Sequence, residues 1–201
     1  MATVLSVNVG TPRPVVLGRT RTSSIEKHPV AGPVAVGALG LDGDRVSNTK
    51  HHGGLDKAVY AFAREDLDHW ERELGREIRD GLFGENLTTR GIDVNAAEIG
   101  ERWRIGDAVL EVSSVRTPCR VFQAWLKQDG FDTTSWARRF TAAGRPGPYL
   151  RVVEEGVIEA GDTVEVVHRP GHGLTVSGLF AAVTGGADGT NLTLATRELP
   201  T

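Results

Sequence analysis

The residues best suited to chemistry surround Cys119, the single cysteine of this 201-residue sequence. Arg116 and Arg120 flank it, so two guanidinium groups lie within three residues of the thiol. Positive charge favours a thiolate over a thiol, and the thiolate is the form that attacks an electrophile or binds a metal. We therefore predict a functional role for Cys119. A lone cysteine can equally be a small buried apolar side chain, and this alternative stays open from the residues alone.

The elements expected around Cys119 give it a defined place. Residues 108–112 have the pattern of a β-strand, and residues 121–128 are typical of a helix. Pro118 ends the strand, because its nitrogen carries no hydrogen and because it restricts the preceding residue to extended geometry. Cys119 is thus expected at a strand-to-helix junction, where the positive end of the helix adds to the effect of the arginines.

A second group of polar residues surrounds the paired glycines Gly53 and Gly54. Glycines let the backbone approach a ligand closely and leave N–H groups free to point at an anion. The flanking residues that could take part are His51, His52, Asp56 and Lys57. The segment lacks the ending of a Walker loop, and adjacent histidines on extended chain face opposite sides, so neither a nucleotide loop nor a two-histidine metal site is expected. A simple glycine turn with solvated neighbours stays open.

A third group lies in the turn 81–89, which contains two glycines, an aromatic residue and the polar pair Glu85 and Asn86. This pair could offer hydrogen bonds to a heterocycle. The alternative is that Asn86 only satisfies the backbone of the turn.

The remaining pattern is one of many short strands and few helices. Residues 64–74 form the clearest amphipathic helix, and residues 131–143 are expected to form another, with Thr133 or Thr134 as its N-cap. The polar run 19–24 is expected to be a loop or a short edge segment. Strand patterns lie at 2–9, 58–63, 108–112 and in two pieces of 156–167. The pattern predicts a mostly β, α+β fold of barrel-like kind with helical insertions.

Composition narrows the class of protein. The net charge is −3 and the hydrophobic fraction 39%, which gives no sign of a nucleic-acid-binding or membrane-surface protein. No apolar run reaches about 18 residues, so a membrane-spanning helix is not expected. A single cysteine excludes an internal disulfide framework and suits the reducing cytoplasm. Residues 1–10 alternate like a strand without a basic leader, so a signal peptide is not expected either.

The chain is expected to divide near residue 170. Residues 1–169 are predicted to form one β domain, and residues 170–201, rich in small and polar residues, a linker and a short helical tail. Helical segments of this tail are expected at 175–183 and 192–199.

Several segments, in their order along the chain, resemble the MOSC domain, the carboxy-terminal domain family of molybdenum cofactor sulfurases, and within it the free-standing YiiM-like branch. They include Lys27-His28-Pro29-Val30 and Arg116-Thr117-Pro118-Cys119. The others are 40–44, 51–60, 81–87, 99–106 and 144–151. Together they cover roughly residues 2 to 168. The tail from Pro170 resembles a shortened form of the small three-helix module that often follows this domain.

The resemblance implies a closed β-barrel and a site for the molybdenum cofactor, which is molybdopterin carrying molybdenum. Cys119 would be the thiolate ligand of the metal or the residue that relays sulfur. Lys27 and Arg116 would be catalytic residues in the same pocket. The residues that would bind the cofactor are His51, His52, Gly53, Gly54, Asp56, Lys57, Glu85, Asn86, Arg120, Arg145 and Tyr149.

Three functions remain as hypotheses. The first is a molybdenum-dependent reductase of small N-hydroxylated compounds such as 6-hydroxylaminopurine; its electrons would come from an external electron-transfer protein, because no ferredoxin-type or flavin-binding segment is present. The second is a carrier of the cofactor, or of sulfur as a Cys119 persulfide. The third is a small-anion-binding β module whose cysteine is only buried. The sequence does not fix the oligomeric state, and a homodimer stays open.

Overall fold

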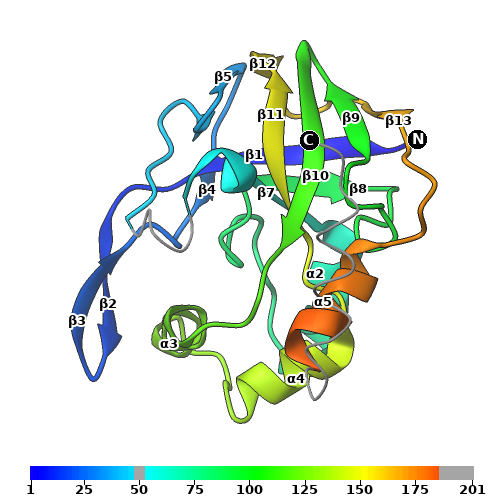
Figure 1. Ribbon diagram of the computed structural model, residues 1–201. Coiled ribbons are helices and arrows are strands. Elements are labelled where there is room, and N and C mark those ends of the chain that lie inside the picture. Colours follow the sequence, from blue (N-terminus) through cyan, green and yellow to red (C-terminus); the bar gives the residue numbers. More distant parts are fainter. Residues whose placement is uncertain (48–52, 186–201) are drawn as a thin grey trace.

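The computed structural model describes residues 1–47 and 53–185, which form a mostly β structure with four α-helices (Figure 1). The strands are β1 (Thr3–Val9), β2 (Arg13–Leu17), β3 (Arg19–Ser23), β4 (His28–Pro29), β5 (Val34–Gly37), β6 (Gly40–Leu41), β7 (Val59–Ala63), β8 (Leu87–Arg90), β9 (Arg102–Ile105), β10 (Ala108–Val115), β11 (Pro148–Glu154), β12 (Gly156–Ile158) and β13 (Val164–His168). The helices are the 3₁₀ helix η1 (Leu55–Lys57) and the α-helices α2 (Arg64–Leu74), α3 (Arg120–Gln128), α4 (Trp136–Ala143) and α5 (Val176–Thr184). The predicted α+β class, mostly sheet, is confirmed.

The main sheet has eight strands in the order β13-β9-β10-β11-β7-β8-β1-β4. Its pairs are antiparallel except β7 and β8, which run parallel. A parallel pair needs a crossover connection, and α2 lies in the chain between the two strands. The helices gather at one end of the sheet (Figure 1).

The two sides of this sheet approach each other near the start of β1. Thr3 and Thr163 form a bridge, and the Val4 N–H donates to the Asp162 carbonyl at 2.9 Å. The Val164 N–H also donates to the Ala2 carbonyl, at 3.0 Å. Among the described residues the strand pairings run in a linear order from β13 to β4, and only an isolated bridge and single hydrogen bonds connect β1 with the start of β13. The closed barrel therefore stays a prediction.

Two hydrophobic clusters hold the fold together. One lies within the curved sheet and is mainly aliphatic. The other lies between the sheet and the helices and is mainly aromatic. In the aromatic cluster the rings of Trp70 and Trp136 are 4.8 Å apart between centroids, and those of Phe83 and Phe122 are 5.0 Å apart. Such ring pairs add to the burial of apolar area. Through Phe122 the cluster fixes α3, and with it the residue that precedes the helix.

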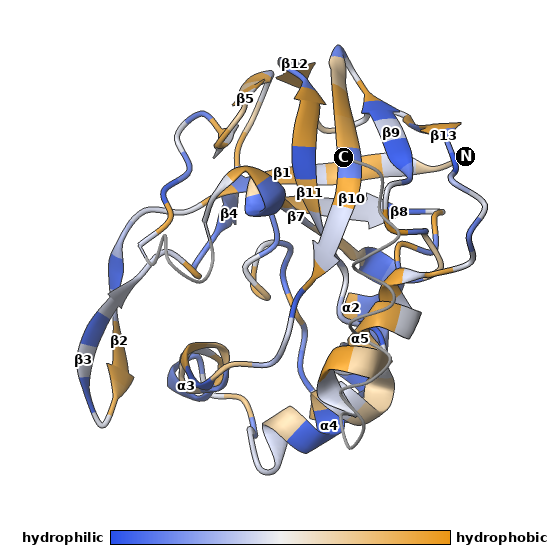
Figure 2. Ribbon diagram, in the orientation of Figure 1, coloured by the Kyte–Doolittle hydropathy of each residue, from blue (hydrophilic) through white to orange (hydrophobic). Residues whose placement is uncertain are grey.

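The hairpin β2–β3 projects from the body of the protein, while its strands pair along residues 13–23 (Figure 1). The run 19–24, expected as a loop or an edge segment, is therefore largely a paired strand. Figure 2 shows β2 as predominantly hydrophobic and β3 as hydrophilic. Val15 of β2 is buried in the aromatic cluster, which anchors the hairpin to the body.

Helix α4 begins later than expected. It starts at Trp136, and its N-cap is Ser135 in the left-handed region, without a side-chain cap, so Thr133 and Thr134 do not cap it. The Asp132 carboxylate accepts the Thr134 N–H at 2.9 Å. This local turn competes with a helical first turn, which explains the later start.

The described part of the tail packs on the domain. Val176 and Phe180 of α5 are buried, and the Phe180 ring meets Phe140 edge to face at 6.1 Å. The helix expected at 175–183 is confirmed, whereas the one at 192–199 lies outside the described residues. The division at residue 170 stays a prediction. None of the helices in the described part of the chain has the length and apolar content that a bilayer crossing needs.

Replacement of Gly147 by alanine tests the packing of the loop before β11. Gly147 has φ +71°, and a Cβ there would overlap the Ala61 carbonyl oxygen and lie 2.9 Å from the Phe62 ring. A left-handed backbone costs a non-glycine residue about 1–2 kcal/mol, and the overlap adds to this. We expect Gly147→Ala to lower the free energy of unfolding by at least about 3 kcal/mol in urea denaturation.

The matched control for this loop is Gly144→Ala. Gly144 has φ +65° but open space where its Cβ would stand. It should lose only the backbone contribution of about 1–2 kcal/mol. Equal losses in the two variants would contradict the packing explanation.

Candidate functional site

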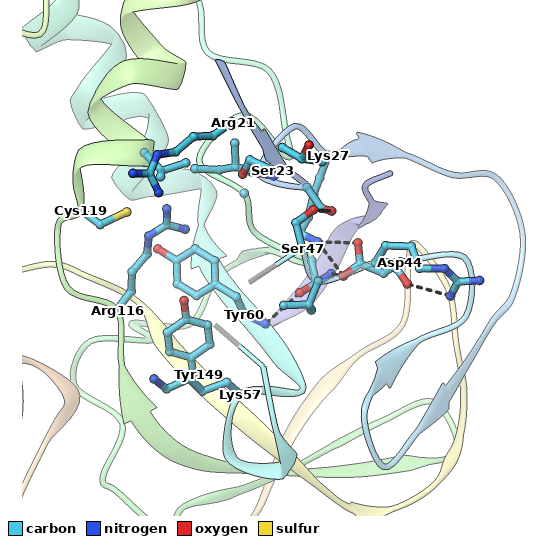
Figure 3. Close-up of a pocket in the computed structure, with 18 of the residues that line it drawn as sticks. Arg21, Ser23, Lys27, Asp44, Ser47, Lys57, Tyr60, Arg116, Cys119 and Tyr149 are labelled. Carbon is cyan, nitrogen blue, oxygen red and sulfur yellow. Dashed lines mark hydrogen bonds and ion pairs between the residues drawn. The ribbon is translucent and has the colours of Figure 1, made fainter. Parts of the chain in front are cut away.

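One cavity of about 510 Å³ lies between the hairpin, the start of α3 and the strands β7 and β11 of the sheet (Figure 3). The hairpin side is lined by residues 19–25. The opposite side is lined by Tyr60, Arg116, Cys119 and Tyr149. Its remaining lining residues are Lys27, Asp44, Arg45, Val46, Ser47, Lys57, Ala58, Gly84, Asn86 and Val121.

Cys119 stands at the junction that the sequence predicts. β10 ends at Val115, α3 begins at Arg120, and Cys119 is the N-cap between them. Its Sγ accepts the Phe122 N–H at 3.4 Å, and the side chain is half-buried in the cavity wall. The thiol is thus held by its own helix while one side remains open to a ligand.

Arg116 is the buried cation beside this thiol. Only 4% of the residue is exposed, and one terminal nitrogen donates to the Phe83 carbonyl at 2.7 Å. The guanidinium lies over the Tyr60 ring at 4.9 Å and over Phe122 at 4.2 Å. Its Nε has no hydrogen-bond partner, and it forms no ion pair with a described carboxylate. Burial lowers the pKa of Arg116, but Tyr60, Tyr149 and Cys119 raise it more, so the pKa is raised.

Lys27 is buried in the cavity wall as an ion pair with Asp44. Its Nζ lies 2.5 and 2.6 Å from the two carboxylate oxygens. Asp44 also accepts the Gly10 N–H at 2.7 Å, so the carboxylate is fixed to the backbone just after the end of β1. Burial lowers the pKa of Lys27 more than Asp44 raises it. The pair therefore presents a cation that gives up its proton more readily than an exposed lysine.

Asn86 lines the cavity, but its amide is engaged within the protein. The side-chain oxygen accepts the Tyr60 N–H at 3.1 Å. The side-chain nitrogen donates to the Asn8 carbonyl at 3.2 Å and to Asp44 at 2.9 Å. Both hydrogens of this nitrogen are thus used, and Asn86 could donate to a ligand only by releasing one of these partners.

Two tyrosine rings, tilted by 41° to each other, form part of the cavity wall. The rings of Tyr60 and Tyr149 are 5.3 Å apart, and the Tyr60 hydroxyl donates to the Pro146 carbonyl at 2.7 Å. Lys57 lies 5.7 Å from the centre of the Tyr149 ring. Burial raises the pKa of both tyrosines, so both stay protonated at neutral pH.

Glu85 lies under the cavity rather than in it. It is fully buried, and one carboxylate oxygen accepts the Gly81 N–H at 2.6 Å and the Thr88 hydroxyl at 3.1 Å. The other oxygen has no partner. Burial outweighs these hydrogen bonds and raises the pKa of Glu85 to about 7.

The other described residues predicted to bind a cofactor do not line the cavity. Arg145 pairs with Asp66 and, at 3.0 Å, with Asp93. Asp56 pairs with Arg151 at 2.9 Å. Arg120 is exposed and lines a second, more open hollow with residues of α3 and the loop 131–135. Gly53 and Gly54 lead into η1 outside the cavity lining, and Gly54 has φ +97°. His51 and His52 lie outside the described residues.

Sequence reasoning missed the residues that the hairpin contributes. Arg19 and Arg21 both line the cavity, as do Thr20, Thr22, Ser23 and Ser24. The available signal was the alternation of arginine and threonine over 19–22, which suits a polar strand. Asp44 and Tyr60, which the sequence analysis gave only as parts of matched segments, also line the cavity, as does Arg45.

The cavity is strongly basic. Six of its lining residues are basic, namely Arg19, Arg21, Lys27, Arg45, Lys57 and Arg116. Asp44 is the one carboxylate among the described lining residues, and it is engaged by Lys27. Residues 1–47 and 53–185 contain no cluster of three or more histidine, cysteine or acidic side chains that could hold a metal ion. What the cavity offers a ligand is one sulfur, several cations and two aromatic faces.

The raised pKa of Glu85 should make the free energy of unfolding depend on pH. Its pKa in the folded protein, about 7, lies above the ordinary value of 4.5. The unfolded chain therefore loses its proton first as the pH rises, and the free energy of unfolding should fall between pH 4.5 and 7, by up to about 3 kcal/mol. Urea denaturation across this range should show the decline in the wild type and a flatter profile in Glu85→Gln. Exposed Glu77, replaced by glutamine, is the control and should keep the wild-type slope.

The sequence of this chain is similar to known proteins of one family. The model of the family described as "MOSC domain" matches residues 48–165. The uncharacterized protein YflK of Bacillus subtilis is 32% identical over 197 residues, which are 98% of this chain and 86% of that protein. A protein named "Reductase" from Gibberella moniliformis is 34% identical over 174 residues, which are 83% of this chain but only 29% of that longer protein.

The solved structures include a similar fold. The crystal structure of YiiM from Geobacillus stearothermophilus superposes with a TM-score of 0.73 and 31% identity, over 91% of this chain and 84% of that one. With a family match over more than half of its length and a 32% identical relative along nearly all of it, this chain belongs to the MOSC domain family, and YiiM is among its relatives.

Proposed function

We propose that this chain binds the molybdenum cofactor in the Cys119 cavity and reduces N-hydroxylated compounds, with the Cys119 thiolate as the protein ligand of the metal. The observation that carries the proposal is the cavity itself, which the single cysteine of the chain lines together with six basic side chains. The family is associated with this cofactor, and the name of one relative, "Reductase", supports redox chemistry.

The residues present fit the group. Molybdenum held by sulfur ligands accepts a further soft ligand, and a thiolate is the softest that a protein offers. The phosphate of molybdopterin needs cations and N–H donors, which the basic lining supplies. Arg116 Nε is a buried donor without a partner, and such atoms call for an acceptor from outside the chain. The aromatic side chains of Tyr60 and Tyr149 in the cavity wall suit a planar heterocycle.

The side chains of the cavity would divide the remaining tasks. When bound, the cofactor would supply the two-electron chemistry that removes an oxygen atom from nitrogen. Conversion of an N-hydroxyl group to an amine and water consumes two electrons and two protons. Lys27 Nζ, with its lowered pKa, would deliver a proton to the departing oxygen, and Asp44 would hold the lysine in place meanwhile. The positive charge of Arg116 would stabilise the negative charge of the Cys119 thiolate. The electrons would come from a separate electron-transfer protein.

Replacement of Cys119 by serine tests the ligand assignment. Protein expressed with molybdate should contain molybdenum and pterin, and it should reduce 6-hydroxylaminopurine with an artificial electron donor. A hydroxyl is a harder and far weaker ligand, so we expect Cys119→Ser to lose at least about a hundredfold in activity and most of its metal, with an unchanged thermal unfolding midpoint. Lys127→Gln, at the exposed far end of α3, is the matched control and should behave as the wild type.

The outcomes separate the candidate functions. Metal and pterin in the wild type without turnover would favour a carrier of cofactor or sulfur and would contradict the reductase. Absence of both from the wild type would contradict cofactor binding altogether. Normal turnover by Cys119→Ser would overturn the ligand assignment.

A further inference from the structure

The charge of Arg116 is unusual because it is buried without a matching carboxylate. Buried guanidinium groups are normally paired, since removal of a charge from water is costly. Arg116 instead donates one hydrogen bond to a carbonyl, stacks on two aromatic rings and leaves Nε without a partner. The carboxylate that lines the same cavity, Asp44, is held by Lys27, Gly10 and Asn86. Buried Glu85 acts on Arg116 only through space, without an ion pair, so an anion in contact with Arg116 must come from outside the described residues.

A second guanidinium reaches the same place from the hairpin. Arg21 lies directly opposite Val15 in the β2–β3 pairing, so the two side chains share a face. Because Val15 is buried against the body, Arg21 stands on the face that looks inward, and it lines the cavity. Figure 3 shows the Arg21 side chain extending toward the end of the cavity where Arg116 and the Cys119 sulfur lie. The Arg21 side chain forms no hydrogen bond or ion pair with another described residue, although its backbone pairs with Val15.

The hairpin is held so that this convergence persists. The Gln128 side chain of α3 accepts the Val16 N–H at 3.2 Å and donates to the Pro14 carbonyl at 3.3 Å. The helix that begins after Cys119 thus also anchors the strand that pairs with β3. The first residue of α3 follows Cys119, and its last residue holds the hairpin that carries Arg21.

We propose that Arg21 and Arg116 form a two-guanidinium clamp for an oxyanion beside the Cys119 sulfur. Two like charges that converge without a carboxylate in contact repel each other, and an anion with two or more oxygen acceptors relieves both at once. The ligand class is a carboxylate or phosphate group, which guanidinium groups bind through paired hydrogen bonds. This clamp is a property of the chain before any cofactor binds, and it does not rest on the proposed redox activity. If that activity holds, the clamp favours substrates that carry an acidic group.

Alkylation of the single cysteine tests the clamp directly. Iodoacetate and iodoacetamide attack the same sulfur, but only iodoacetate carries a carboxylate that the clamp can bind. The measured quantity is the rate constant for alkylation of Cys119 by iodoacetate divided by that for iodoacetamide. Both are measured on the full chain purified without added molybdate. Iodoacetamide reports the accessibility of the sulfur, so the ratio isolates the contribution of the anion site.

We expect a saturable reaction with iodoacetate in the wild type, slowed by inorganic phosphate and by added salt. Arg21→Gln should lower the rate ratio about five- to tenfold, which corresponds to one unit charge at contact distance in a solvated site. Arg21→Lys, which keeps the charge but not the paired donors, should lower the ratio by a smaller factor. Arg13→Gln removes a charge from the same hairpin outside the cavity lining and should leave the ratio unchanged.

Three results would overturn the clamp or reduce it to a general charge effect. An equal ratio in the wild type and in Arg21→Gln would overturn the clamp, as would a wild-type ratio that phosphate does not change. A similar fall in Arg13→Gln would reduce the effect to the general charge of the hairpin and would also overturn it. None of these outcomes depends on molybdenum content, so failure of the clamp and failure of the proposed reductase are distinguished.

Discussion

The hydrogen bonds of Asn86 hold the cavity in place. Its backbone N–H donates to the Tyr60 carbonyl at 2.8 Å, and its carbonyl accepts the Asn8 N–H at 2.7 Å. Its side chain bonds to the same two residues and to Asp44. One residue thereby joins β1, β7 and the turn that carries Asp44, and Asp44 in turn fixes Lys27. A buried network in which each member is satisfied is rigid, and here it sets the depth of the cavity.

The opposite wall depends on packing rather than on hydrogen bonds. Phe83, Phe122 and Trp136 form an edge-to-face cluster that fixes the first turn of α3. Arg116 lies across Phe122 and Tyr60 at the border of this cluster. The aromatic rings therefore shield the guanidinium from water while they leave it without a negative partner. A cation held in this way binds an anionic ligand more strongly than a solvated one does, because the surroundings screen it less.

Much of this arrangement could be predicted from local sequence. Pro118 marks the end of the strand before Cys119, and the spacing of Leu67 and Trp70 marks α2, so the junction and the helix follow from local rules. The place of Arg145 could not be predicted in this way. In a glycine- and proline-rich segment it suits a phosphate, yet in the fold it meets Asp66, which lies 79 residues earlier. Which carboxylate a basic residue meets depends on tertiary structure, and nothing in the spacing of the sequence encodes it.

The strand β3 of the hairpin also could not be predicted from the local sequence. The run 19–24 lacks apolar alternation because its strand buries almost nothing itself; Val15, on the partner strand, provides the anchor. A strand that faces a solvent-filled cavity has the composition of a loop, so periodicity of apolar residues does not find it. The proposed anion site depends on that polarity, because a surface of threonine and arginine side chains binds a charged ligand better than an apolar surface does. Residues of this kind are found by asking which cations lack a partner in the fold, and Arg21 and Arg116 are two that face the same sulfur.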